Sequence, residues 1–325
     1  MLMKCLTSLS LILAAAVLLP SCAVAKDLDV FQPPGDFSIK AQSFPPRPGE
    51  PAEYGASGAT PNWSIAQWGV PEGKLPPFKV THQGNDTIVS SVSPGASVVV
   101  KRGPDGAESY TLSQNGAVLP CDLAPGKPRE FDLFASPDVN TSPAADRNAY
   151  HIPINGSALT AMSHLRVRAT ISMHYADISV PESCGVSQGG VLISVILNNL
   201  VSHQTLFYQL GLGSMCGPQP AARAALCRNA LVHPGSNFFF RANPFGVSDA
   251  LPLLGQPWLK NGETRTIDVD ILPRLLHFVR TGPPKMDHDP AHWVLGSYYN
   301  GQHIWGDVTM TTKWQNVGMA VTLPE

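Results

Sequence analysis

The segment LRVRATISMHYADI, residues 165–178, alternates apolar and polar side chains over most of its length. Its odd-numbered positions from Leu165 to Tyr175 are apolar, whereas the even-numbered positions from Arg166 to His174 are polar. Successive side chains of a strand point to opposite faces, so this period of two predicts a β-strand that buries one face only. A sheet with one buried face has to pack against a second layer.

Further strands follow from similar patterns. The run GVLISVILNN (190–199) is apolar on both faces, which predicts a central strand, and TLFYQLGL (205–212) is expected to pair with it in antiparallel orientation. The segment 97–113 predicts a hairpin with Gly103-Pro104-Asp105-Gly106 at its tip. The segment REFDLFA (129–135) alternates again.

The chain as a whole has many turn residues and enough apolar residues for a core. It contains 28 glycines and 31 prolines, and 43% of its residues are hydrophobic. Strands and helices do not alternate along the chain, which disfavours a parallel α/β fold. We predict an all-β protein, an antiparallel β-sandwich of jelly-roll type, with the central strands drawn from 165–178, 190–199, 205–212 and 293–314.

Two short helices complete the expected fold. Pro220 is placed to begin a helix in AARAALCRNALV. A strand at 267–271 leads into a second helix, which Pro273 opens and Gly282 ends.

The first 25 residues resemble a secretory signal peptide. Lys4 precedes the apolar run from Leu9 to Leu19, which is too short to span a bilayer, and Ala23-Val24-Ala25 forms a cleavage site. The sequence therefore predicts a secreted or periplasmic protein. The segment Leu19–Cys22 is close to a lipobox, so a lipoprotein anchored at Cys22 is the alternative.

The mature chain is expected to contain a Pro-rich extended lead-in at 26–77, followed by the β-sandwich at 78–325. The polar loop 136–148 is a candidate for a further domain boundary within this sandwich. Trp63 and Trp68 anchor the lead-in, either as core residues or as an exposed platform for sugars.

Four cysteines remain after cleavage, and an even number in an exported chain predicts two disulfides. The local pair is Cys216–Cys227, which leaves Cys121–Cys184. The sequence has no CxxC spacing, so zinc is not expected.

Charge and motifs exclude several classes of partner. The net charge is −2, only 14% of residues are charged, and no run of basic residues occurs. Nucleic acids and anionic membranes attract clustered lysine and arginine, so neither is expected as a partner, and no membrane span is predicted. No phosphate-binding loop, dinucleotide fingerprint or G-x-S-x-G motif is present, and we predict no cofactor.

The segment SYYNGQHIWGD (297–307) contains Asn300-Gly301, a strong signal for a two-residue hairpin turn. Such a turn would place Tyr299 opposite Gln302 and divide the side chains between two faces. One face, with Tyr299 and Ile304, suits the core.

The other face of this expected hairpin suits a ligand. It would hold Tyr298, His303, Trp305 and Asp307, with Trp305 lying flat over Gly296. Aromatic faces stack on the C–H faces of sugars, and polar tips bind hydroxyl groups, so these four are the predicted ligand-binding residues. One alternative is that the 273–280 helix or the lead-in covers this face and makes Trp305 a core residue. Another is a register slip or a bulge at Gly306.

The loop MDHDPAHW (286–293) holds Asp287 and Asp289, which are weak candidates for a Ca²⁺ site. It lacks the downstream glycine and glutamate of an EF-hand, so a solvated loop or helix cap is the preferred interpretation.

Glu130 and Asp132 share one face of a strand, roughly 6–7 Å apart, and such a pair can perform acid–base chemistry on a glycoside. The segment EFDLFA resembles the Glu-x-Asp-x-x-Glu strand of the laminarinase-type glucanases, which share the concanavalin-A-like jelly roll. The resemblance covers six residues and assigns Glu130 and Asp132 to the first two acids. Ala135 stands in place of the third acid, the acid/base, so the resemblance does not carry hydrolysis with it.

Three functions follow. The first is non-catalytic binding of a polysaccharide or glycan through the face that bears Trp305. The second is a glycoside hydrolase or lyase that degrades polysaccharide with Glu130 and Asp132 as its acids. The third is a secreted structural or surface protein that binds no small ligand.

Overall fold

The computed structural model describes residues 26–31, 33–40, 53–58, 61–69, 75–83, 86–103, 106–118, 130–137, 158–177, 188–216, 225, 231, 233–306 and 308–324.

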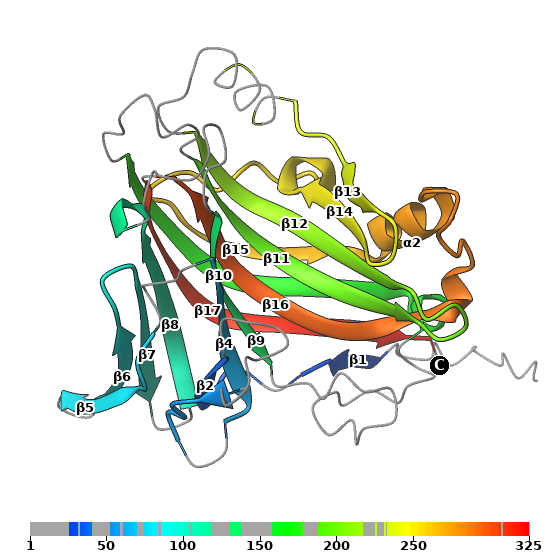
Figure 1. The fold of residues 1–325 in the computed structure, drawn as a ribbon. Coiled ribbons are helices and arrows are strands. Elements are labelled where there is room, and N and C mark those ends of the chain that lie inside the picture. Colours follow the sequence, from blue (N-terminus) through cyan, green and yellow to red (C-terminus); the bar gives the residue numbers. More distant parts are fainter. Residues whose placement is uncertain are drawn as a thin grey trace, which may run out of the picture.

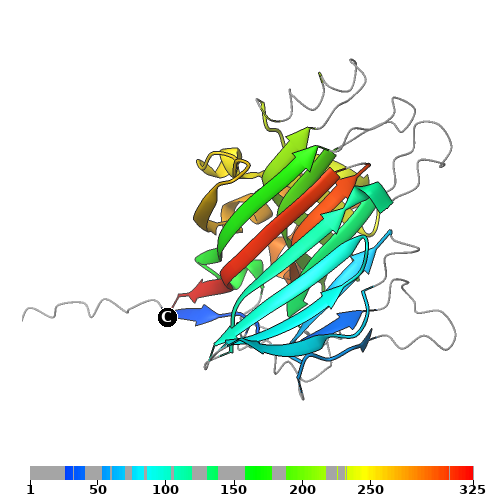
Figure 2. The same ribbon diagram turned by 90° about the vertical axis from the view of Figure 1, so that its left-hand side faces the viewer.

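Two β-sheets packed face to face form the protein (Figure 1), as the sequence predicted. Sheet A has eight strands, and Figure 2 shows it face on. Seven of them lie in the spatial order β15 (Thr264–Asp270), β10 (His164–Asp177), β17 (Val308–Leu323), β8 (Gly106–Asn115), β7 (Ala96–Gly103), β6 (Asp86–Val92) and β5 (Lys79–Gln83). The eighth strand, β1 (Lys26–Asp29), pairs with the far end of β17.

Sheet B has nine strands and carries the residues of functional interest. Its order is β13 (Asn237–Arg241), β14 (Phe245–Ala250), β12 (Thr205–Cys216), β11 (Gln188–Asn199), β16 (Trp293–Trp305), β9 (Glu130–Pro137), β4 (Trp63–Trp68), β2 (Phe37–Lys40) and β3 (Glu53–Tyr54). Most neighbours are antiparallel, whereas β2·β4 and β12·β14 are parallel. Short 3-10 turns lie at Gly116–Val118, Leu159–Ala161, Leu251–Leu254 and Pro290–His292.

We call the face of each sheet that is turned toward the other sheet its inner face. The inner faces meet in an apolar core with an aromatic centre. Trp63 lies 6.3 Å from both Tyr110 and Tyr298, measured between ring centroids, and all three side chains are buried. Each ring removes roughly 150–250 Å² from water, so this cluster contributes strongly to holding the sheets together.

The strands expected from alternation are present. The predicted segments 97–113, 129–135, 165–178, 190–199 and 205–212 correspond to β7 with β8, β9, β10, β11 and β12. β11 pairs with β12 in antiparallel orientation and is flanked on its other side by β16, so it is the predicted central strand. The Pro-rich segment contributes β2, β3 and β4 to sheet B.

The helix α2 (Leu272–Thr281) is also confirmed, with Pro273 in its first turn and Gly282 after its end. Its Phe278 contacts Tyr208 and Phe238, each at 6.0 Å between ring centroids. Tyr208 belongs to the inner face of sheet B, so α2 packs against the core. It therefore does not cover His303 and Trp305, as one of the two covers proposed for the hairpin face would require.

The predicted turn at Asn300-Gly301 is wrong. β16 runs without interruption from Trp293 to Trp305, between β11 on one side and β9 on the other. The Asn300 side chain is buried and accepts a hydrogen bond from the Tyr110 hydroxyl at 2.9 Å. At Gly301, a Cβ atom would lie 2.2 Å from the Leu133 carbonyl oxygen of β9. Ladder pairing on both edges outweighs the local turn preference of Asn-Gly.

The same correction applies to the segment 293–314. β16 belongs to sheet B and β17 to sheet A, so the chain crosses between the two layers after Trp305 rather than forming a hairpin in one sheet. The face assignments change as well, because alternation continues through residue 300. Tyr298 is fully buried on the inner face, where it contacts Phe31 and Trp63, and Tyr299 lies on the outer face.

Several expectations lie outside the described residues. They are the signal segment 1–25, most of the predicted helix after Pro220, and the cysteines other than Cys216. Cys216 is disulfide-bonded, but the pairings Cys216–Cys227 and Cys121–Cys184 stay predictions. Among the described helices, none is long and apolar enough to cross a bilayer.

Candidate functional site

The outer face of sheet B gathers carboxylates and aromatic rings around β9. Alternation along β9 turns Phe131, Leu133 and Ala135 into the core and leaves Glu130 and Asp132 on the outer face. Glu130 is exposed and Asp132 is half-buried. The sequence predicted this separation of faces, because a strand flanked on both sides keeps a strict period of two.

Cross-strand register gives each carboxylate an aromatic neighbour. Asp132 pairs with His303 of β16 on one side and with Trp68 of β4 on the other. Glu130 pairs with Trp305 of β16. Directly opposite residues have Cβ atoms about 4.5–5.5 Å apart, so these side chains share one small patch.

The rings on this patch lie close to one another. Ring centroids are 5.1 Å apart for His303–Trp305, 4.9 Å for Phe134–Tyr299 and 5.9 Å for Trp68–Phe134. Trp68 is 39% exposed, and Trp305 is half-buried. The patch therefore offers ring surface to solvent at two places beside the carboxylates.

His303 lies over a glycine of the neighbouring strand β11. A Cβ atom on Gly190 would meet the His303 ring at 2.7 Å, so only glycine leaves room for it. The sequence predicted a ring over a glycine on this face, with Trp305 over Gly296. In the structure the ring is that of His303 and the glycine is Gly190, because these two residues lie opposite each other in the ladder.

Asp132 and Glu130 are chemically coupled. Burial raises the pKa of Asp132 to about 8, and the negative charge of Glu130 and a hydrogen bond to its side chain raise it further in the same direction. Asp132 therefore holds its proton at neutral pH and shares it with the Glu130 carboxylate. A carboxylic acid that stays protonated near pH 7 can donate a proton or a hydrogen bond to a ligand.

Two further groups on the patch are neutral. Burial lowers the pKa of His303 to about 4, so its imidazole is uncharged at neutral pH. Burial also raises the pKa of the Tyr299 hydroxyl, which accepts a hydrogen bond from Gln209 of β12 at 3.1 Å. Beside the charge that Glu130 carries, the patch thus presents hydroxyl, imidazole and carboxylic acid groups, which suit recognition of a polar but uncharged ligand.

The structure brings together four of the six predicted site residues: Glu130, Asp132, His303 and Trp305. It does not bring Tyr298 with them, because that side chain is enclosed in the core. Asp307 lies outside the described residues. No ion-binding group of three or more His, Cys, Asp or Glu is found in the described part of the chain.

The weak metal candidates Asp287 and Asp289 have structural partners instead. Asp287 forms an ion pair with His292 at 2.8 Å, and Asp289 accepts a hydrogen bond from the Ala291 amide at the start of a 3-10 turn. Asp289 is therefore a helix cap, as the preferred interpretation of the sequence held.

Sequence reasoning missed several residues of this face. Tyr299 is expected on the core side of the hairpin rather than beside the carboxylates, and no sequence pattern places Trp68 opposite Asp132. Phe239 of β13, at the far edge of the sheet, is 40% exposed and its ring lies over Gly246. Only the register of non-adjacent strands reveals these positions, so no short-range signal could have found them together.

Comparisons with known proteins give similarities in structure only. No family model matches the chain, and no curated protein matches it by sequence. The family 12 xyloglucanase from Bacillus licheniformis has a TM-score of 0.42 at 9% identity, with 77% of this chain and 99% of that chain covered. The family 11 xylanase from Neocallimastix patriciarum has a TM-score of 0.41 at 7% identity, with 79% and 100% covered.

A third similar structure is the xyloglucanase domain of NopAA, a type three effector from Sinorhizobium fredii, solved in complex with cellobiose. Its TM-score is 0.36 at 11% identity, with 77% of this chain and 98% of that chain covered. At such values the likeness says nothing about substrate or mechanism, which have to be argued from the residues of this chain.

Proposed function

We propose that this protein is a polysaccharide-degrading glycoside hydrolase whose substrate lies on the outer face of sheet B. The observation that carries the proposal is the Glu130/Asp132 pair, in which one carboxyl keeps its proton at neutral pH beside a second that bears a charge. Glycoside hydrolysis uses such a pair, one group as acid and the other as nucleophile or base. Strongly shifted pKa values also gather at functional sites.

The roles follow from the surroundings of each carboxyl. Asp132, half-buried between Trp68 and His303, is the acid that protonates the glycosidic oxygen. Glu130, which is exposed, supplies the carboxylate that faces the anomeric carbon. The backbone positions i and i+2 of a strand are about 6.5–7 Å apart. If the Glu130 side chain rotates away from Asp132, the two carboxyl groups reach the separation of about 5–5.5 Å that is found in retaining glycosidases.

The aromatic neighbours supply a surface for sugar rings. Trp68 and Trp305 flank the carboxyl pair along adjacent strands, and His303 offers an uncharged imidazole. Stacking of these rings on the C–H faces of pyranoses, together with few polar groups, is typical of carbohydrate sites.

Release of reducing ends from a panel of soluble β-glucans, xylan and xyloglucan tests this proposal. Asp132→Asn and Glu130→Gln are expected to lower the rate at least about a hundredfold, because each removes one of the two reacting groups. Asp268→Asn serves as the control, since Asp268 pairs with Arg166 on sheet A, away from the outer face of sheet B. No product from any of these glycans would contradict the proposal.

The second candidate is non-catalytic binding of a polysaccharide on the same face. It is favoured by the hydrogen bond between Asp132 and Glu130. This bond holds the two carboxyl groups closer together than they are in retaining or in inverting glycosidases. This candidate predicts retention on insoluble polysaccharide without product release, and loss of retention in Trp305→Ala with the fold intact. Absence of both retention and product would favour the third hypothesis, a structural protein.

Export and the disulfides Cys216–Cys227 and Cys121–Cys184 belong to the proposal as well. The segment 1–25 predicts secretion or delivery to the periplasm, with lipidation at Cys22 as the alternative. An exported enzyme of this kind meets polysaccharide outside the cytoplasm.

A further inference from the structure

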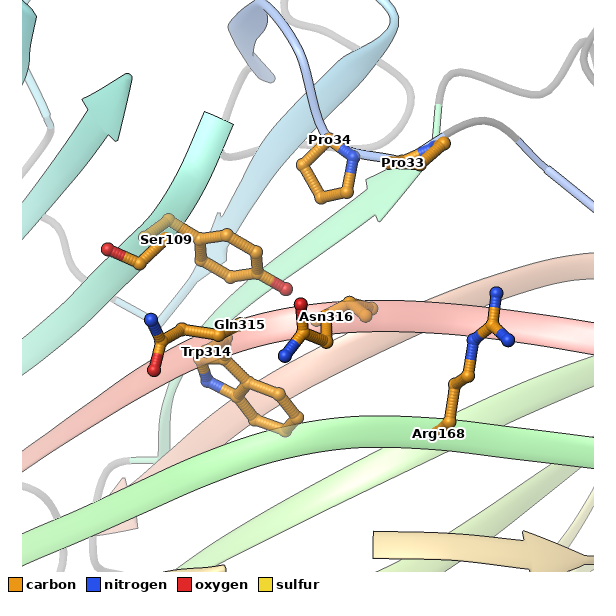
Figure 3. Close-up of a pocket in the computed structure, with 9 residues that line it drawn as sticks. Pro33, Pro34, Ser109, Arg168, Trp314, Gln315 and Asn316 are labelled. Carbon is orange, nitrogen blue, oxygen red and sulfur yellow. The ribbon is translucent and has the colours of Figure 1, made fainter. Parts of the chain in front are cut away.

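A pocket lies in sheet A, at a gap in the strand pairing, on the side of the sandwich opposite to the proposed active face. Pairing of β17 with β8 ends at Trp314, and its pairing with β1 begins at Ala320. Between these points the structure has a cavity of about 420 Å³, which β17, β8, β10 and the segment after β1 line (Figure 3). This volume lies within the range of about 300–1,000 Å³ that is usual for small-molecule sites.

The backbone at this gap is bulged. Asn316 has a φ of +51°, and the ladder between β10 and β17 shifts register next to it, between Arg168 and Thr170. Left-handed backbone costs an asparagine free energy, and bulges often redirect side chains at sites of function. Here the bulge turns consecutive side chains of β17 toward the pocket, where Gln315 and Asn316 lie on its wall (Figure 3).

Polar groups with spare bonding capacity line the pocket. The Ser109 hydroxyl and the Gln315 amide make no hydrogen bond to another described residue. Asn316 is exposed and uses one amide hydrogen for a long bond to Thr170, at 3.4 Å. Unlike a sealed cavity, the pocket thus offers donors and acceptors at a rim that solvent reaches.

Charge and apolar surface limit what this pocket accepts. Arg168 donates to Asp29 at 2.8 Å, so its charge is already compensated and an anion gains little there. Buried apolar surface comes from Pro34, Trp314 and Val317. Amide, hydroxyl and guanidinium groups beside an apolar wall suit a ligand that has hydroxyl groups and C–H faces but no charge.

We propose that this pocket binds one or two neutral sugar units, at a second carbohydrate site separate from the Glu130/Asp132 face. The two sites lie on different sheets, so one glycan chain or two neighbouring chains can engage both. Two weak binding sites that engage the same glycan chain give a higher overall affinity than either site has alone. The inference stands on the pocket alone and does not depend on hydrolysis.

Titration of the ¹⁵N-labelled full-length protein with cellobiose and with xylobiose tests the inference, because the side-chain amide signals of Gln315 and Asn316 report on the pocket. We expect a saturable shift of these signals with at least one of the two disaccharides. Asp132→Asn should leave this shift unchanged, which separates the pocket from the proposed active face.

Two variants address the pocket, and one serves as the matched control. Gln315→Ala removes the amide, and Asn316→Gly removes a side chain while keeping a residue that accepts the positive φ. Each is expected to weaken binding about tenfold, the effect of one or two lost neutral hydrogen bonds. Lys313→Ala, on the same strand but outside the pocket, should bind as the wild type does. No shift with either sugar up to roughly 50 mM would overturn the proposal, and so would equal binding by all variants.

Discussion

Asp132 of β9 and His303 of β16 lie directly opposite each other on the outer face of sheet B, and burial shifts the pKa of each toward its neutral form. The acid keeps its proton and the imidazole loses one, so neither adds a charge at neutral pH. Removal of charged groups from water is costly, and this site avoids the cost by neutralising both.

Stability should fall as pH rises through the Asp132 transition. Its pKa in the folded protein is about 8, well above the ordinary value of about 3.9 for an unfolded chain. The stabilisation from the protonated form is complete below about pH 4 and is lost as pH rises through about 8. Asp132→Asn is neutral at every pH, so its free energy of unfolding should decline less than that of the wild type between pH 5 and 9.

Urea unfolding across this pH window measures the effect. Glu130→Gln should show an intermediate slope, because burial is the largest cause of the shift and the charge of Glu130 is a smaller one. Parallel profiles for the wild type and Asp132→Asn would show that Asp132 is not protonated in the folded state.

His303 should act in the opposite direction on the acid side. Its pKa is about 4 in the folded protein, below the ordinary value of about 6.5. The stabilisation from its neutral form is complete above about pH 6.5 and is lost as pH falls through about 4. ¹H–¹³C NMR of the imidazole should show a midpoint near 4. A midpoint near 6.5 would mean that the ring is open to water.

Asn300→Gly distinguishes a strand from a turn at this position. In a type I′ turn, glycine would be accepted at almost no cost. In β16, the change removes the hydrogen bond between Asn300 and the buried Tyr110 hydroxyl and adds backbone freedom. We expect a loss of about 2–3 kcal/mol in the free energy of unfolding, measured by chemical denaturation. A change below about 0.5 kcal/mol would favour the turn.

Trp63 and Trp68 provide a matched pair on one strand. Trp63 is fully buried in the core, so Trp63→Ala should cost about 3–5 kcal/mol of stability. Trp68 is 39% exposed on the outer face, and Trp68→Ala should cost about 1 kcal/mol or less while lowering retention on polysaccharide about tenfold. Full retention by Trp68→Ala would remove this ring from the proposed site.

Local alternation was enough to predict the strands and their faces where no strong turn signal intervened. In β9 and β10, the period of two assigned the inner and outer residues correctly, including Glu130 and Asp132. This succeeds because a half-buried strand has apolar residues on its buried face and polar residues on its exposed face, and they alternate in its own sequence.

Partners across the sheet could not be predicted, because they depend on strand order. Asn300-Gly301 has the sequence of a turn but lies in a strand that is paired on both edges, and this single error moved Tyr298 to the wrong face. Likewise, Gly190 makes room for His303 only because β11 neighbours β16. These contacts join residues more than a hundred positions apart, beyond the reach of any local pattern.

The pH dependence of reducing-end release tests the central claim most directly. If Asp132 is the acid, hydrolysis of the most reactive glycan should persist at neutral pH and fall as pH rises through about 8, as the proton is lost. In Glu130→Gln, any residual activity should fall at a lower pH, because the charge that helps to hold the proton is gone, and Asp132→Asn should be inactive throughout. Undiminished release by Asp132→Asn, or no release from the wild type at any pH, would contradict the account.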